Sequence, residues 1–431
     1  LVANRFFDNG YASFNPDTDW NASPSLVGYY AVGMHLLGVA HWLLEEAALR
    51  GHRDIYFLAR DGYLLQQAVE LLNRYEMKPI RTHEMQASRK CLMPAILATP
   101  QDLFAIPVVY RHHSPDTITE LLGFCFQDGA LSKLQEAAEK VGLPWQERFS
   151  TQEDLHRFLS LFLETGYDSE KHANALKVLG KYYEPLCTPD AAVFDMGYSG
   201  RLLSALGVAC GKPVFAYYIH NDGNKCMQLQ KRSGFGMSAF YSIPPAMSGM
   251  LREHMLSSLT PACIAIREQD GQPVPVFEKT KPGYSTVFVA ETIQKAALEM
   301  VRDYSERFGN GLPYSPQQVS MPFEGFLRCA LPADHRMFEE SYFEDDVYGG
   351  CSKIGIYTLA RRQVDTLDPP APKAPVIPPP PAPPRHPRVR KVADKTKMRL
   401  KDKPALYKMV RFGYKGVKKM YQFVRKEKAG S

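Results

Sequence analysis

The segment AAVFDMGYSGRLLSAL, residues 191–206, contains the pattern that decides the fold. Its first residues, 191–194, are small or apolar and suit a strand that is buried on both faces of a sheet. Asp195 follows, and then two glycines let the backbone bend closely around a ligand before a helical pattern begins. The N–H groups at a helix N-terminus attract negative charge, so we expect a phosphate or a similar anion at this turn. Its expected ligand-binding residues are Gly197, Ser199, Gly200 and Arg201.

A second segment, DIYFLARDGYLL at residues 54–65, repeats this order of strand, turn and helix. If the two strands are parallel neighbours, Asp61 and Asp195 converge at the carboxyl edge of the sheet, where open α/β sheets bind ligands. The alternative is that each aspartate only caps the helix that follows it. We assign Asp61 and Asp195 as candidate catalytic and metal-binding residues, and Arg60 and Gly62 as candidate phosphate-binding residues.

Two further strand ends carry candidate ligand-binding residues. Ser88 and Arg89 follow an expected strand at residues 79–85, and a guanidinium can make bidentate bonds to phosphate. They can equally form a surface cap and a solvated charge. His220 and Asp222 follow a later expected strand, where the alternative is a plain Asn-Asp-Gly turn. None of these turns matches a dinucleotide or P-loop fingerprint.

The pattern as a whole predicts an α/β fold with a Rossmann-like, mostly parallel sheet. Helical periodicity runs almost unbroken through residues 99–187, with helices expected at 100–105, 117–124, 131–141, 152–165 and 169–183, so we expect this insert to form a cap over the site. Residues 26–44 hold no Asp, Glu, Lys or Arg, but their glycines and histidines favour a buried core helix over a membrane span. The expected units are two parts of the α/β domain, residues 1–98 and 188–365, the cap at 99–187, a Pro-rich linker at 366–387 and a basic tail at 388–431. The second part is expected to contain a β-hairpin with its turn at Asp270 and Gly271, and helices at 286–308 and 315–330.

The composition predicts a folded protein of the cytosol with a separate basic tail. Eight cysteines form no CxxC pair, which is typical of reduced, buried thiols. From Arg385 onward there are 17 basic and 3 acidic residues, a net charge of +14, whereas the whole chain carries +6. The remainder of the chain therefore carries −8, and the two regions are interpreted separately.

The tail follows a spacer with 11 prolines between Pro369 and Pro387, which is expected to be a stiff polyproline segment. Residues 404–428 place apolar and aromatic side chains on one helical face and basic side chains around the others. This pattern favours binding to an anionic membrane surface. RNA or another acidic partner would use the same charges, and an unbound tail is a further alternative, but we do not expect a nucleic-acid partner.

The motifs IYFLARDGYLL, ASRK, VFDMGYSGRLL and FAYYIHN resemble those of a bacterial family from capsule and O-antigen gene clusters. The similarity continues through LREHMLSSLTPA and DGQPVPVFE to about residue 348 and leaves out the tail. Members of this family are described as predicted hydrolases of the haloacid dehalogenase (HAD) superfamily, often fused to glycosyltransferases. The resemblance implies a role in surface polysaccharide assembly at the inner face of the bacterial plasma membrane, with a glycosyltransferase as partner.

One feature of the HAD superfamily is missing from this chain. HAD phosphatases use a DxD motif at the end of their first strand, whereas Asp61 is followed by Gly-Tyr and Asp195 by Met-Gly. Aspartyl-phosphate chemistry is therefore not assigned, and a Mg²⁺ ion held by Asp61 and Asp195 is a conjecture.

Three hypotheses for the function follow from the sequence. The first is a HAD-like domain that binds a phosphorylated sugar or nucleotide sugar, for phosphoryl or glycosyl transfer. The second is a phosphoribosyltransferase-like enzyme, suggested by the order of an acidic turn and a Gly-rich turn. The third is a non-catalytic scaffold that holds a glycosyltransferase at the membrane. Whether the protein is an enzyme is left open between them.

Overall fold

A computed structural model covers the chain and describes residues 1–7, 16–242, 249–279, 283–344, 353–358, 360 and 361. The chain divides into two units, residues 1–369 and 370–431. The predicted linker at 366–387 and the predicted basic tail at 388–431, with its membrane-binding helix at 404–428, lie outside the described residues.

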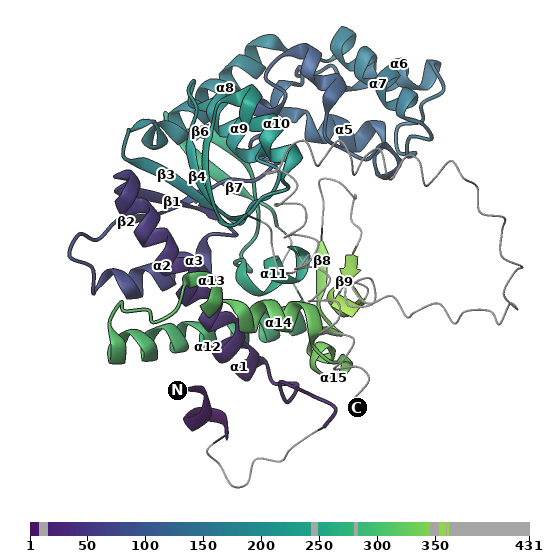
Figure 1. The fold of residues 1–431 in the computed structure, drawn as a ribbon. Coiled ribbons are helices and arrows are strands. Elements are labelled where there is room, and N and C mark those ends of the chain that lie inside the picture. The colour runs from purple at the N-terminus through teal and green to yellow at the C-terminus, as the bar shows by residue number, and fades with distance from the viewer. Residues whose placement is uncertain (8–15, 243–248, 280–282, 345–352, 359, 362–431) are drawn as a thin grey trace, which may run out of the picture. The chain divides into compact units, whose positions relative to one another are not determined.

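Five parallel strands form the central sheet, and they are β1 (Asp54–Ala59), β2 (Arg81–Gln86), β3 (Ala191–Asp195), β4 (Phe215–His220) and β5 (Gly236–Tyr241). Their spatial order is β2-β1-β3-β4-β5 (Figure 1). The chain leaves β1 to form β2 on one side and then returns to form β3 on the other, so the order reverses between β1 and β3. Such a switch point is where open α/β sheets bind ligands. The predicted Rossmann-like α/β fold is confirmed.

Helices cover both faces of this sheet (Figure 1). One layer contains α2 (Gly33–Arg50), α3 (Tyr63–Asn73) and α12 (Tyr284–Phe308), and the other contains α4 (Met93–Ile96), α8 (Ser169–Tyr183) and α9 (Arg201–Ala209). Successive side chains of a strand point to opposite faces. Phe57 and Phe194 accordingly pack with the α2 layer, whereas Leu58 and Val193 pack with the α8 layer. The strands β1 and β3 are thus buried on both sides, as their apolar sequences predict.

The helical run before β1 begins at Ser23, whose hydroxyl accepts a hydrogen bond from the Leu26 N–H. It passes through α1 (Pro24–Leu26) and a π-helical stretch, Val27–Val32, into α2. Pro24–Arg50 is long and apolar enough to span a bilayer. However, 89% of its most apolar 18-residue stretch is buried inside the structure. It packs against α3 and α12 as the predicted core helix.

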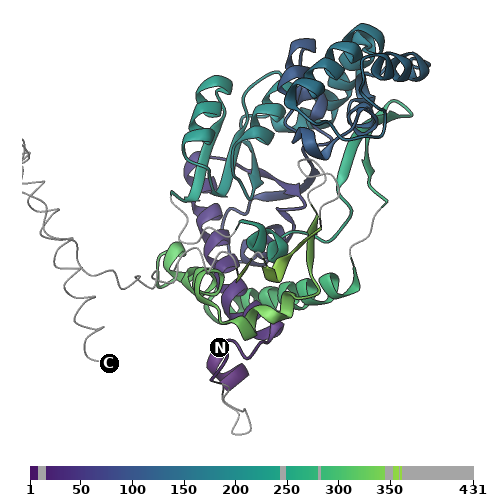
Figure 2. The ribbon, with the colours of Figure 1, turned by 90° about the vertical axis from the view of Figure 1, so that its right-hand side faces the viewer.

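The insert at residues 99–187 is helical, with α5 (Pro115–Leu121), α6 (Leu131–Lys140) and α7 (Gln152–Thr165) before α8. The helices predicted at 152–165 and 169–183 match α7 and α8, whereas residues 100–105 form a 3₁₀ helix. Phe158 and Phe162 lie at the centre of a separate hydrophobic core in this region. Two perpendicular views place α5, α6 and α7 at the end of the domain away from α12 (Figures 1 and 2).

The remainder of the first unit contains the predicted hairpin, β6 (Cys263–Gln269) and β7 (Gln272–Phe277). Its turn residues, Asp270 and Gly271, have φ angles of 52° and 73°, which suit a two-residue hairpin turn. The helix predicted at 315–330 is instead divided into α13 (Pro316–Val319) and α14 (Met321–Cys329), with Pro322 in the first turn of α14. The other elements are α10 (Asn224–Ser233), α11 (Gly249–Leu256), α15 (Pro332–His335), β8 (Tyr342–Glu344) and β9 (Lys353–Gly355).

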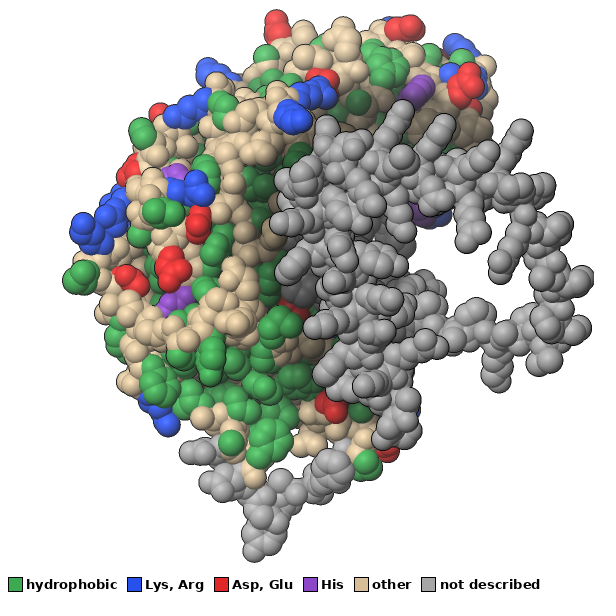
Figure 3. Space-filling model, viewed as in Figure 1, with side chains coloured by type: hydrophobic (Ala, Val, Ile, Leu, Met, Phe, Trp, Pro, Cys, Tyr) green, Lys and Arg blue, Asp and Glu red, His purple; other side chains and the backbone are tan. Residues whose placement is uncertain are grey.

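Charged side chains of both signs are scattered over the visible described surface, while hydrophobic side chains gather in the lower part of this view (Figure 3). In this view the basic side chains of the described residues are interspersed with acidic ones (Figure 3). The charged groups that bear on function are found at the edge of the sheet.

Candidate functional site

A cleft of about 1260 Å³ lies at the carboxyl edge of the sheet. The turns after β1, β2, β3 and β4 contribute to its lining, as do α11, the start of β6, the first turn of α12 and Tyr342 of β8. None of the described residues that line it comes from 99–187, so this insert adds no side chain to the cleft wall, and its role as a cap stays a prediction. The insert buries its apolar side chains in its own core and against α8, which leaves α11 and α12 to form the wall of the cleft.

The turn after β1 brings Arg60 and Asp61 to the cleft. The Ala59–Arg60 peptide is cis, and the Gly62 N–H donates to the Leu58 carbonyl at 2.7 Å. A Cβ atom on Gly62 would lie 2.7 Å from the Cβ of Phe57, so only glycine allows the chain to turn so tightly against the strand. Gly62 does not itself line the cleft, and its predicted role in phosphate binding is replaced by this packing role.

The turn after β3 packs against the end of β4 as tightly as the turn after β1 packs against its own strand. Gly197 has a φ of 130°, and a Cβ atom on it would lie 2.1 Å from the His220 carbonyl oxygen. The Tyr198 carbonyl accepts a hydrogen bond from the Asp222 N–H at 2.9 Å, which ties this turn to the loop after β4. Gly200 has a φ of 80° and directly precedes α9. The glycines predicted from the sequence are therefore required by backbone geometry, and Gly197, Ser199, Gly200 and Arg201 all line the cleft.

The two aspartates do not cap the helices that follow them. Gly62 is the N-cap of α3 and Gly200 is the N-cap of α9, and neither helix has a side-chain capping bond. The capping alternative is therefore wrong for both Asp61 and Asp195. Because neither carboxylate is used at a helix start, both are available to the cleft that they line.

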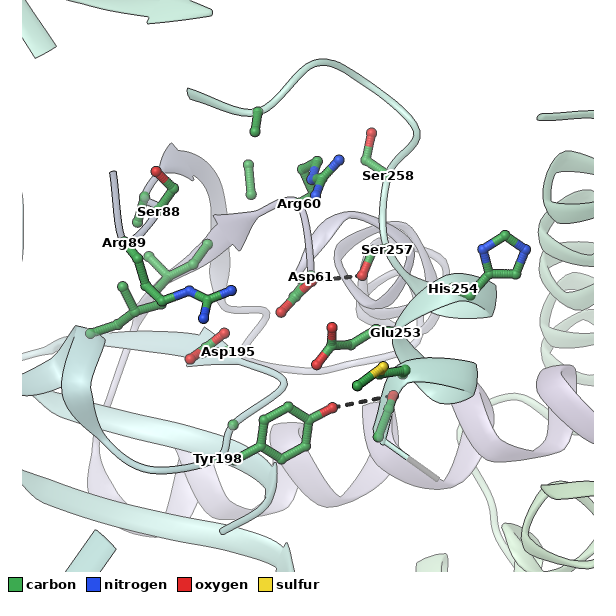
Figure 4. A pocket seen from close by; sticks show the side chains of 18 of the residues that line it. Arg60, Asp61, Ser88, Arg89, Asp195, Tyr198, Glu253, His254, Ser257 and Ser258 are labelled. Atoms are coloured by element: carbon green, nitrogen blue, oxygen red, sulfur yellow. Dashed lines mark hydrogen bonds between the residues drawn. The ribbon is translucent and has the colours of Figure 1, made fainter. Parts of the chain in front are cut away.

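Asp61 and Asp195 converge with a third carboxylate, Glu253 of α11 (Figure 4). Asp61 accepts a hydrogen bond from the Ser257 hydroxyl at 2.6 Å. Asp195 is only 2% exposed, and its Oδ2 atom has no hydrogen-bond partner among the described residues. A buried carboxylate oxygen with no partner is costly unless it holds a proton or meets a cation or a ligand.

The environments of the two aspartates differ in a way that separates their protonation states. Burial raises the pKa of Asp195 well above its usual range, and the charges of Asp61 and Glu253 raise it further. Burial also raises the pKa of Asp61, but the Ser257 hydrogen bond and the positive charges of Arg60 and Arg89 act against it. Asp195 is therefore the residue of the pair that retains a proton, while Asp61 is the one that ionises.

Positive side chains lie in the same cleft as these acids. Arg89 points toward Asp195 (Figure 4), and α9 begins at the cleft with Arg201. A helix N-terminus and guanidinium groups are both suited to phosphate oxygens. The cationic residues among the described lining residues are Arg60, Arg89, Lys90, Arg201 and Lys225.

Ser88 lines the cleft, but its hydroxyl is engaged within the protein. It donates to the Cys263 carbonyl and accepts from the Cys91 N–H at 3.0 Å. These bonds agree with the cap alternative for Ser88, and this residue joins the loop after β2 to the start of β6. Its neighbour Arg89 remains a candidate for anion binding.

His220 and Asp222 also reach the cleft. The His220 ring lies against that of Tyr198, with 4.5 Å between the ring centres. Burial, together with the charge of Arg252, lowers the pKa of His220 to about 4, so the ring is neutral at pH 7. The Asn221 side chain accepts from the Gly223 N–H at 2.8 Å, which forms the predicted Asn-Asp-Gly turn.

Sequence reasoning missed the contribution of α11. Glu253 lies on α11 and Ser257 directly follows the last residue of this helix, where its N–H still donates to the Glu253 carbonyl at 2.8 Å, so both line the cleft beside Asp61. On another face, Arg252 is completely buried and makes two hydrogen bonds to Glu324 of α14, at 2.8 and 2.9 Å. The spacing of Glu253 and Ser257 within LREHMLSS was a signal, but the sequence did not show which sheet edge this short helix would meet.

The donor set is compatible with a magnesium ion shared with a ligand. Mg²⁺ is commonly held by one or two carboxylates together with substrate phosphates. Asp61 and Asp195 are such carboxylates, and the unpartnered Oδ2 of Asp195 would suit a cation. Within the described part of the chain, no group of three or more His, Cys, Asp or Glu side chains is placed to hold a metal by itself. Binding of Mg²⁺ therefore stays a prediction.

In comparisons with known protein families and with curated proteins, the chain matches no family model and no curated sequence. A functional proposal therefore starts from the geometry of the site.

Proposed function

We propose that the cleft binds a phosphorylated sugar or a nucleotide sugar and that Asp61 and Asp195 act on it in a phosphoryl or glycosyl transfer. One observation carries this proposal. The two acidic turns meet at the β1/β3 switch point, where three arginines line the same cleft. Acids that can exchange protons beside groups that neutralise phosphate are what such a transfer requires.

The size of the cleft favours the larger of these ligands. Small-molecule sites usually enclose about 300–1,000 Å³, and this cleft encloses about 1260 Å³. Tyr284, at the start of α12, lines it and is 82% exposed. An exposed aromatic ring at the rim of a polar cleft offers a flat apolar surface to a nucleobase or a sugar face.

Each residue has a distinct role in the proposed reaction. Asp61, ionised, accepts the proton of the attacking hydroxyl group, and Asp195, protonated, donates a proton to the leaving oxygen. Arg89 and Arg201 neutralise the phosphate charge. The first N–H groups of α9, with Ser199 and Gly200, hold the phosphate oxygens in place. A magnesium ion held by Asp61 and Asp195 would require Asp195 to be ionised, so it is an alternative to the acid role of Asp195, and it would then supply charge neutralisation at the phosphate.

The biological setting that we propose comes from the family resemblance. It is surface polysaccharide assembly at the inner face of the bacterial plasma membrane, with a glycosyltransferase as partner and the tail as membrane contact. The support is the set of shared motifs, which includes both acidic turns of the cleft and the LREHMLSS segment of α11.

The proposal is tested by calorimetric titration of the full chain with UDP-glucose, glucose 1-phosphate and phosphoribosyl pyrophosphate, each with Mg²⁺ and with EDTA. We expect UDP-glucose to bind and Asp195→Asn to weaken this binding at least tenfold. The matched control is Asp128→Asn, because Asp128 has an exposed side chain paired with Lys171 outside the cleft.

Three other outcomes contradict parts of the proposal. Equal affinity of the wild type and Asp195→Asn for UDP-glucose would show that Asp195 does not contribute to ligand binding. Binding of phosphoribosyl pyrophosphate alone would favour the phosphoribosyltransferase-like alternative. Tight binding of a sugar nucleotide without turnover in phosphatase and glycosyltransferase assays would favour the scaffold.

A further inference from the structure

His35 of α2 is a buried polar residue that the proposed function does not use. Its side chain is 0% exposed, and neither ring nitrogen has a hydrogen-bond partner among the described residues. The ring lies among Phe240, Tyr241 and Phe323, with centre-to-centre distances of 6.0, 6.4 and 4.7 Å. Buried ring nitrogens are normally satisfied, so this histidine needs a partner that the protein groups around it do not supply.

A small cavity lies next to His35, separate from the cleft. Asp61 lines both spaces and so forms part of the wall between them. The centre of a water molecule can occupy about 10 Å³ of this cavity, which is about the space that a single buried water requires. Six of the eight lining residues are apolar, and the two polar ones are His35 and Asp61. One water at this place would therefore have a polar partner on each side.

We propose that one buried water molecule bridges a ring nitrogen of His35 and the carboxylate of Asp61. The water accepts the N–H of the neutral His35 ring and donates to Asp61. The Ser257 hydroxyl donates to Oδ1 of the same carboxylate from α11. Asp61 is then held from the core side by the water and from α11 by Ser257. His35 is a positioning residue in this arrangement and does not contact a ligand in the cleft.

The protonation state of His35 agrees with its role as a donor of one N–H. Burial lowers the pKa of His35 well below its usual range, and the charges of Arg252 on α11 and His220 on β4 lower it further. The titratable groups that face His35 are thus Arg252, His220, Tyr241 of β5 and Asp61 through the cavity.

The most direct test is a crystal structure of the full chain at a resolution that shows ordered waters. A water within hydrogen-bond distance of both His35 and Asp61 is the expected result. An empty cavity, or a water that contacts only one of the two residues, would overturn the proposal. This observation requires no ligand, so it stands apart from any failure of the proposed function.

A second test compares crystal structures of two variants at the same resolution. His35→Leu removes the water's partner, so the water is expected to be lost. His35→Gln keeps an N–H donor, so the water is expected to remain. A water that persists in His35→Leu, or that is lost in both variants, would contradict a bridging role for His35. Circular dichroism confirms that each variant is folded before crystallisation.

Discussion

Arg252 and Glu324 form a bidentate ion pair in the core of the domain, with exposures of 0% and 2%, directly behind the helix face that presents Glu253 to the cleft. The pair links α11 to α14. Because α11 and the residue that directly follows it contribute Glu253 and Ser257 to the cleft wall, the position of these two residues depends on a contact that no ligand touches.

Breaking this pair is expected to destabilise the fold strongly. Arg252→Met leaves the Glu324 carboxylate buried without its partner, which costs about 3–5 kcal/mol for buried pairs in general. The measurement is urea denaturation followed by circular dichroism. Lys295→Ala is the matched control, since it breaks an exposed pair with Glu291 and should cost less than about 1 kcal/mol. Similar decreases in the free energy of unfolding for the two variants would show that the buried pair stabilises the fold no more than the exposed pair does.

The protonated state of Asp195 predicts how stability changes with pH. An aspartate with a raised native pKa binds more protons when folded than when unfolded, so the free energy of unfolding falls as pH rises. The fall begins near the usual aspartate pKa of about 3.9 and continues up to the native pKa. Asp195→Asn should remove this component, because the amide does not titrate. Comparing unfolding of the two proteins from pH 4 to pH 8 isolates it from the other titrating groups, and parallel curves would contradict a raised pKa.

Gly197 is expected to tolerate no side chain. Gly197→Ala combines an unfavourable φ of 130° with a Cβ only 2.1 Å from the His220 carbonyl oxygen, so we expect a loss of about 3 kcal/mol or more. Gly211 has a φ of 66° but open space around its Cβ position, so Gly211→Ala should cost only about 1 kcal/mol. Thermal unfolding compares the two, and a smaller loss at Gly197 than at Gly211 would refute the close approach of this turn to β4.

Two of the serines that line the cleft, Ser88 and Ser199, are expected to respond in opposite ways. Ser88→Ala removes hydrogen bonds to Cys91 and Cys263, so it should lower stability by about 1–2 kcal/mol and leave the affinity for UDP-glucose unchanged. Ser199→Ala should weaken ligand binding and leave stability unchanged. Calorimetric titration and thermal unfolding of both variants test this prediction. A loss of affinity in Ser88→Ala but not in Ser199→Ala would show that Ser88, and not Ser199, contributes to ligand binding.

Much of the fold could be predicted because its signals are local. The strand-turn-helix pattern at residues 54–65 and 191–206 depends on apolar runs and glycines that are adjacent in the sequence, and both strands lie where they were expected. The hairpin was predicted from Asp270 and Gly271 for the same reason. Strand β5 was missed, since GMSAFY at residues 236–241 has weak alternation and pairs only with β4.

The candidate site was predictable only where neighbouring parallel strands bring their ends together. The convergence of Asp61 and Asp195 follows from the sheet order, which the two patterns indicate. The position of α11 depends on a buried contact across 72 residues, Arg252 to Glu324, and no local pattern reveals it. The sequence also did not show that residues 99–187 add no side chain to the cleft lining, because sequence separation between two strands does not say which residues of an insert will reach the sheet edge.

Since residues 99–168, before α8, contribute nothing to the lining of the cleft, this stretch is free to change in length and composition without altering the chemistry at the sheet edge. A search for distant relatives should therefore compare the two acidic turns, the turn after β2 with Arg89, and α11, while letting residues 99–168 vary. Proteins that share those four short segments would be candidate relatives, however different the helices between them.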